Sequence, residues 1–107
     1  MPPTELMKGT LDLLILKTLD LEPRHGISIA DRIAQITNGT FMVKAGSLFP
    51  ALHRLEQNGF IDGEWGQSAE GRRVKAYRLT AAGRRKLTAE TKAWSRIVLA
   101  MGQVLES

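Results

Sequence analysis

The stretch GSLFPALHRLEQNGF (residues 46–60) predicts one short helix with two different faces. Its leucines recur four and then three residues apart, at Leu48, Leu52 and Leu55, so they line one side of an α-helix and predict its buried face. The opposite side carries polar residues and a proline. The sequence therefore raises the question whether this outward face is idle or is the working surface of the protein.

The ends of this helix carry their own signals. Ser47 is expected to cap it, and Pro50 then falls at about the third helical position, where a missing N–H group costs nothing. Asn58 and Gly59 are expected to end it, because glycine adopts a positive φ without strain. These signals predict a helix of about three turns.

Two further helices are expected upstream. Apolar residues are dense over residues 10–21, which predicts a first helix buried against several partners. Ser28 is expected to cap a second helix, whose buried face would be formed by isoleucines spaced four and then three residues apart. Residues 41–43, Phe-Met-Val, predict a short strand before the helix at 46–60.

Downstream, the composition changes to that of a β-hairpin and a long helix. Residues 61–65 and 74–79 have strand-like composition and are separated by a polar, glycine-containing tip. Thr80 is expected to cap a final helix that runs towards Glu106. Gly83 weakens its first turn by about 1 kcal/mol, which is too little to cancel so long a helical pattern.

The order of elements predicts the fold class. Three helices followed by a hairpin is the order of a winged helix-turn-helix, an α+β fold that is mainly α. We expect residues 1–80 to form a DNA-binding winged helix-turn-helix and residues 81–107 to form a C-terminal dimerisation helix. A chain of 107 residues makes one small unit.

Composition narrows the class of protein. The net charge of +4 and pI near 9.9 favour an acidic partner such as nucleic acid, although a mild excess is common on ordinary proteins. The absence of cysteine excludes disulfides, thiolate zinc sites and a thiol nucleophile. The apolar run at residues 11–21 contains charges and is shorter than the ~20 residues of a membrane span. We expect a cytoplasmic protein without a membrane partner.

Enzymatic chemistry is not expected. The two histidines, His25 and His53, lie far apart in the chain, and no glycine-rich phosphate loop or constellation of carboxylates is visible. His53 and Glu56, three residues apart, do not make a metal site without further ligands. We therefore expect no cofactor and no metal.

Four ordered segments cover nearly the whole chain: KGTLDLLILKTL (8–19), HGISIADRI (25–33), GSLFPALHRLEQNGFI (46–61) and GRRVKAYRLTAAGRRKL (71–87). In order and spacing they resemble the PadR family of bacterial transcription regulators. The resemblance implies a DNA-binding regulator of the short type, whose single C-terminal helix builds a dimer. Two positions differ, since the family usually has an aromatic residue at Ile27 and tyrosine at Phe49.

The chain from residue 71 to residue 89 contains basic residues and no acidic ones. The basic residues are Arg72, Arg73, Lys75, Arg78, Arg84, Arg85 and Lys86. Arg72, Arg73 and Lys75 are expected to bind phosphates because they lie at or near the hairpin tip. The three cations at the start of the last helix suit a partner anion or serve solubility, and the whole block is equally compatible with a solvated surface.

The outward face of the opening helix supplies further candidates. Those expected to contact duplex DNA are Lys44, Ser47, Pro50, His53 and Arg54. Arg54 can reach a phosphate or donate two hydrogen bonds to guanine, whereas a lone exposed histidine such as His53 is more often a plain surface residue. Phe49 is expected to fill the core, with an apolar contact to a sugar or a thymine methyl as the alternative.

The last helix carries an apolar seam with heptad spacing. The expected interface residues are Leu87, Trp94, Ile97, Val98, Met101 and Leu105. A small domain cannot leave so many apolar residues in water, so we predict a two-fold dimer that reads two half-sites ~34 Å apart. Trp94 is expected to anchor this interface, and the resemblance implies an alternative, that it contacts a flat aromatic effector.

Together these features predict a dimeric, sequence-specific transcriptional regulator. We expect a repressor that binds a pseudo-palindromic promoter operator, and the family resemblance implies the further hypothesis that a small aromatic effector releases it. The alternative is a winged-helix adaptor that binds another protein and does not bind specific DNA. Such an adaptor would keep the fold but would not need the acid-free basic block.

Overall fold

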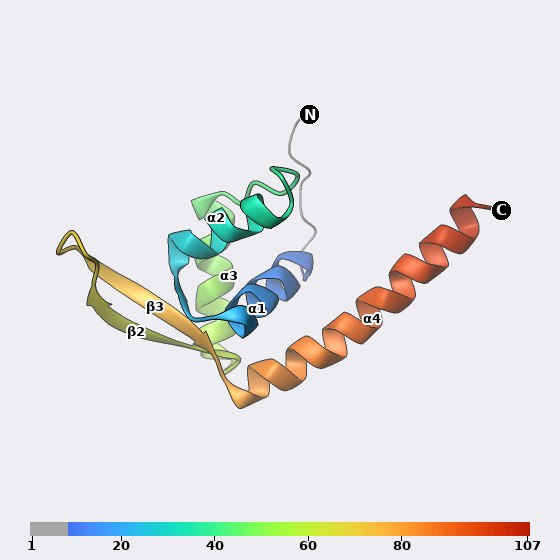
Figure 1. The fold of residues 1–107 in the computed structure, drawn as a ribbon. Coiled ribbons are helices and arrows are strands. Elements are labelled where there is room, and N and C mark those ends of the chain that lie inside the picture. The colour runs from blue at the N-terminus through green and yellow to red at the C-terminus, as the bar shows by residue number, and fades with distance from the viewer. Residues whose placement is uncertain (1–8) are drawn as a thin grey trace.

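The computed structural model describes residues 9–107 and shows a mainly helical fold with a small antiparallel sheet (Figure 1). The elements in chain order are α1 (Thr10–Leu21), β1 (Arg24–His25), α2 (Gly26–Ile36), α3 (Ala45–Gln57), β2 (Ile61–Gln67), β3 (Arg73–Leu79) and α4 (Ala81–Leu105). Helices α1 to α3 pack together, β2 and β3 extend away from them as a hairpin, and α4 projects in another direction (Figure 1). The predicted winged helix fold is confirmed.

The predicted hairpin is present and is longer than the sequence indicated. Strand β2 pairs antiparallel with β3 in a register that joins Ile61 to Leu79 at one end and Gln67 to Arg73 at the other. The third strand of the sheet is β1, which lies on the other side of β3, so that the strand order is β1-β3-β2. The hairpin is therefore anchored to the helical part of the domain through β3, which pairs with β1 at the start of α2.

The predicted strand at residues 41–43 is wrong. This segment is irregular: the backbone N–H of Phe41 donates to the hydroxyl of Thr37 at 3.1 Å, and the half-buried side chains of Phe41 and Val43 pack against the core. Apolar residues in the connection to α3 serve to cover the core. The third strand of the sheet is instead β1, which the sequence did not predict.

The core confirms the leucine face of the opening stretch. Leu48, Leu52 and Leu55 have exposed fractions of 0%, 0% and 2%. The largest fully buried side chains come from α1, α2, α3 and β2 and are Ile15, Leu16, Ile29, Leu48, Leu52 and Ile61. Because α3 is held by this core along one side, its opposite side is fixed in place facing outward.

The predicted cap of the second helix is wrong. Helix α2 begins at Gly26, directly after β1, and its N-cap is His25, whose side chain makes no capping hydrogen bond. Ser28 lies inside the first turn, where its hydroxyl accepts a hydrogen bond from Arg24 at 3.1 Å. The strand pairing of residues 24 and 25 sets the start of the helix, because it fixes an extended backbone up to His25.

The start of α3 also differs from the prediction. The helix begins at Ala45 with Lys44 as N-cap, and the carbonyl of Lys44 accepts hydrogen bonds from Ser47 and Leu48 at 3.0 and 2.9 Å. Ser47 therefore lies in the first turn and is not the cap. Pro50 lies in the second turn, where it has no N–H to donate to the carbonyl four residues earlier, so the expectation that it costs no hydrogen bond is wrong.

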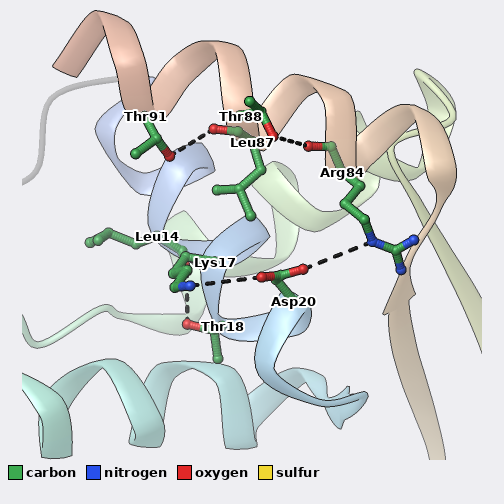
Figure 2. Close-up of polar contacts among 8 residues, drawn as sticks. All are labelled: Leu14, Lys17, Thr18, Asp20, Arg84, Leu87, Thr88 and Thr91. Carbon is green, nitrogen blue, oxygen red and sulfur yellow. Dashed lines mark hydrogen bonds and ion pairs between the residues drawn. The ribbon is translucent and has the colours of Figure 1, made fainter. Parts of the chain in front are cut away.

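Helix α4 begins as predicted and then leaves the domain. The hydroxyl of Thr80 accepts a hydrogen bond from the N–H of Gly83 at 3.0 Å. Gly83 is there because of a close approach, since a Cβ at this position would lie 1.9 Å from the carbonyl oxygen of Phe60. Leu87 is buried against the core, and Figure 2 shows its side chain pointing from α4 towards α1.

Candidate nucleic-acid interface

The hairpin presents two different faces. Alternation along β3 places Arg73, Lys75 and Tyr77 on the face that also contains the buried Leu79, whereas Arg78 lies on the opposite face. Arg78 is exposed there and lies 3.8 Å from Asp62 on the neighbouring strand. The predicted phosphate ligands Arg73 and Lys75 therefore share the side of the hairpin that faces the helices.

The tip of the hairpin is a tight, hydrogen-bonded turn. The N–H of Ser68 donates to the carbonyl of Arg72 at 2.8 Å, and the N–H of Gly71 donates to the carbonyl of Ser68 at 2.9 Å. Gly71 adopts a φ of 79°, a conformation that glycine reaches without strain. The turn holds the exposed Arg72 at the end of the hairpin, as the sequence predicted.

Trp65 organises the cations of the hairpin. The guanidinium of Arg73 lies 4.5 Å from the centre of the indole ring, and the ammonium of Lys75 lies 5.7 Å from it. These distances are within the range of cation–π attraction. The indole itself is 55% exposed. The sequence interpretation missed Trp65, because its pairing across the hairpin with Lys75 depends on the register of the two strands.

Lys75 connects the hairpin to α3. Its ammonium donates a hydrogen bond to the carboxylate of Glu56 on α3 at 2.7 Å, and the two side chains are 24% and 29% exposed. This hydrogen bond raises the pKa of Lys75 above its ordinary value, and burial raises the pKa of the neighbouring Tyr77 phenol. The structure thus gives Lys75 a carboxylate partner within the chain.

Arg54 also has a partner within the domain. Its guanidinium binds the carboxylate of Asp12 on α1 at 2.6 Å. The contact joins α3 to α1 and leaves 40% of the Arg54 side chain exposed. Lys44, Ser47, Pro50 and His53 are exposed on or just before α3, as the sequence predicted for residues that would contact DNA.

Phe49 is not core filler as the sequence interpretation favoured. Its side chain is 43% exposed, and its ring packs over Gly26, where an added Cβ would lie 3.0 Å from a ring carbon. Ile27, which follows Gly26 in the first turn of α2, is 54% exposed. The reason is the position of Phe49 on α3, which overhangs the start of α2 and lies beyond the edge of the core.

A groove of about 440 Å³ lies between the helices and the hairpin. We call it the helix–wing groove. Its lining residues come from β1, the start of α2, α3, β2 and β3, and they include His25, Ile27, Phe49, His53, Trp65 and Arg73. The groove therefore brings together the exposed face of α3, predicted from the opening stretch, and a cation of the predicted basic block.

Two of the three cations at the start of α4, Arg84 and Lys86, have carboxylate neighbours. Arg84 lies 3.9 Å from Asp20 at the end of α1, which also lies 3.7 Å from Lys17 (Figure 2). Lys86 lies 3.0 Å from Glu90, one turn further along α4. An external anion is therefore not needed to account for these two cations at a helix N-terminus.

The predicted seam of α4 is exposed beyond the first turns. Leu87 lies in the protomer's own core and is not part of the exposed seam. The other residues predicted for the seam are between 44% and 76% exposed, and they are Trp94, Ile97, Val98, Met101 and Leu105. Val104, at 72%, extends this strip. The strip covers the part of α4 that projects from the domain (Figure 1).

Among the described residues, no helix is long and apolar enough to cross a membrane.

Comparison with known proteins identifies relatives over most of the chain. Residues 15–89 match the family model described as the transcriptional regulator PadR-like family. A transcriptional regulator of Mycobacterium tuberculosis is 37% identical over 89 residues, which are 83% of this chain and 79% of that protein.

Solved structures agree with this comparison. A PadR family transcriptional regulator from Eggerthella lenta superimposes with a TM-score of 0.80 at 30% identity, covering 94% of this chain and 85% of that chain. A transcriptional regulator from Clostridium thermocellum gives a TM-score of 0.82 at 26% identity, with coverages of 90% and 93%. The similarity therefore includes the hairpin, α3 and most of α4.

Proposed function

Because the chain belongs to the PadR-like family of transcriptional regulators, we propose that it is a dimeric, sequence-specific DNA-binding protein that represses transcription from a pseudo-palindromic operator. The observation that carries the proposal is the helix–wing groove, which joins the exposed side of α3 to the cations of the hairpin. In a winged helix the third helix enters the major groove and the hairpin lies beside it.

The proposed division of labour follows from the contacts within the domain. Ser47, Pro50 and His53 are exposed on α3 and would face the bases and the nearby backbone, with Lys44 at the start of the helix. Arg72 and Arg73 would bind phosphates from the hairpin. Lys75 and Arg54 are bonded to carboxylates, so their main contribution would be to fix the hairpin and α1 relative to α3. We place residues up to 80 in the DNA-binding unit and the following helix in the dimer.

The exposed strip of α4 supports the proposed dimer. Trp94, Ile97, Val98, Met101, Val104 and Leu105 are about half exposed or more. Full burial of a large apolar side chain contributes about 1.5 to 3 kcal/mol, so covering the exposed half of these residues would contribute roughly 5 to 9 kcal/mol per protomer. A second copy packed on this strip by a two-fold axis would present two reading helices to two half-sites.

Trp94 is also the candidate contact for an effector in this proposal. It is 44% exposed on the strip, and a planar aromatic compound that stacks on it would lie between the two copies of α4. Titration of the protein with planar aromatic compounds, followed by tryptophan fluorescence, tests this part. Unchanged Trp94 emission in a Trp65→Phe variant would leave Trp94 with only the role of an interface anchor.

The proposal is tested by selecting bound fragments from genomic DNA with purified protein and footprinting the most enriched one. We expect two protected half-sites about one helical turn, ~34 Å, apart. A winged-helix adaptor, the competing function, would enrich no sequence. It would also retain little DNA affinity at physiological salt, because no specific contacts would add to the charge attraction.

A further inference from the structure

The helix–wing groove has apolar walls that phosphate binding alone does not explain. Ile27, Phe49 and Trp65 line it together and are 54%, 43% and 55% exposed, whereas single exposed apolar residues elsewhere on the surface need no explanation. They come from three different elements, α2, α3 and β2, and they face one shared space. An apolar surface at this position indicates a partner that is itself partly apolar.

The position of the groove identifies which part of a DNA duplex would lie there. Adjacent major and minor grooves are separated by the backbone of a single strand. If α3 enters the major groove and the hairpin reaches the adjacent minor groove, that backbone must pass between them. The space between α3 and the hairpin is the helix–wing groove.

The chemistry of the groove matches this backbone. A DNA strand alternates deoxyribose rings, which have apolar faces, with phosphates, which are anions. The apolar walls suit the sugars, while Arg73, His25 and His53 supply donors for the phosphates. The carboxylate that lines the groove, Glu56, is bonded to the ammonium of Lys75 at 2.7 Å, so its charge is compensated.

We propose that the helix–wing groove seats the sugar–phosphate backbone of one DNA strand, with Phe49 as its wall on the reading helix and Trp65 as its wall on the hairpin. The proposal rests on the proposed function, DNA binding, and adds which part of the duplex occupies the groove. Trp65 has a second task here: its indole lies under the guanidinium of Arg73 at 4.5 Å and holds that cation at the edge of the groove.

A backbone contact is independent of base sequence, and this property gives the test. The probes are the duplex most enriched in the genomic selection and a duplex of equal length with scrambled sequence. Trp65→Ala should weaken binding to both about tenfold, which corresponds to ~1.4 kcal/mol, and leave the ratio of the two affinities unchanged. Trp65→Phe should retain most of the affinity because it keeps an aromatic wall.

The matched control is Ile36→Ala, which removes an equally exposed apolar side chain, 53% exposed, from the end of α2 outside the groove. It should leave both affinities unchanged. A loss with Trp65→Ala on the enriched duplex alone would show that Trp65 reads a base, and no loss on either duplex would show that the groove is empty in the complex. Either result overturns the proposal.

A second measurement does not depend on how the alanine variant folds. In a Trp94→Phe variant, Trp65 is the remaining tryptophan, and its quenching by acrylamide reports its exposure. Either duplex should shield Trp65 at low salt and release it at high salt. Equal quenching with and without bound DNA would refute the seating of the backbone, whereas failure of the unmodified protein to bind either duplex would refute the proposed function itself.

Discussion

Substitution of Met101 by glutamate should dissociate the proposed dimer. Met101 is 56% exposed in the protomer, so a partner that covers it would add roughly half of the 1.5 to 3 kcal/mol that full burial contributes. A two-fold axis applies the change twice, which gives about 2 to 3 kcal/mol before the cost of burying a carboxylate is added. The dissociation constant should therefore rise by about 30- to 150-fold or more.

The chain offers a matched control for this experiment. Leu99 is 64% exposed and lies only two residues away, but it is about 200° further round the helix and therefore off the seam. Leu99→Glu should change the dissociation constant by less than about twofold. Sedimentation or light scattering over a dilution series measures both variants. Equal effects of the two substitutions, or an undiminished dimer with Met101→Glu, would refute the assignment of the seam.

Two further predictions concern the stability of the domain, and a third concerns its binding to DNA. Gly83→Ala should lower the free energy of unfolding by about 1 to 3 kcal/mol in urea titrations, because the added Cβ would lie 1.9 Å from a backbone carbonyl oxygen; an unchanged midpoint would contradict that close approach. The pKa values of Lys75 and Tyr77 are raised in the folded protein from their ordinary values of 10.5 and 10.0, so folding favours the protonated form of both groups. Their contribution to stability is therefore present below about pH 10 and is lost at higher pH. The urea midpoint should accordingly be lower at about pH 11 than at about pH 9. Arg73→Gln should reduce the salt slope of DNA binding by about 2 per dimer, whereas Arg78→Gln, on the other face of the same strand, should leave it unchanged; the opposite ranking would contradict the assigned faces.

The sequence predicted well whatever depended on periodicity. The leucine spacing in residues 46–60 located the buried face of α3, and all three leucines lie in the core. The pattern after residue 60 located the hairpin and the cap of α4 at Thr80. The buried face of a helix or strand follows from the spacing of its own apolar residues, because a rotated helix or a slipped strand register would expose that whole face to water.

Predictions of helix starts failed where pairing between distant segments decided them. The extended backbone at Arg24 and His25 depends on β3, fifty residues later, and a serine that can cap a helix carries no information about that pairing. Ser28 and Ser47 are both good capping residues that lie within first turns. At the start of α2, local capping preference was outweighed by this strand pairing.

The composition of the site was only partly accessible from sequence. The basic block predicted which cations gather near the hairpin, but not that Lys75 bonds to Glu56 or that Arg54 bonds to Asp12. Those partners are 19 and 42 residues away in the chain, so no local pattern joins them. Phe49 was misjudged because a helix position next to the core can still lie beyond its edge.

The most direct test of the account is the salt dependence of binding to the enriched duplex, measured by fluorescence anisotropy together with the number of protomers bound. If a dimer neutralises about three phosphates per protomer, two protomers should bind each duplex, and log K should fall with log salt with a slope of roughly −5. A slope near zero, or one protomer bound per duplex, would contradict DNA binding by a dimer through the hairpin and α3.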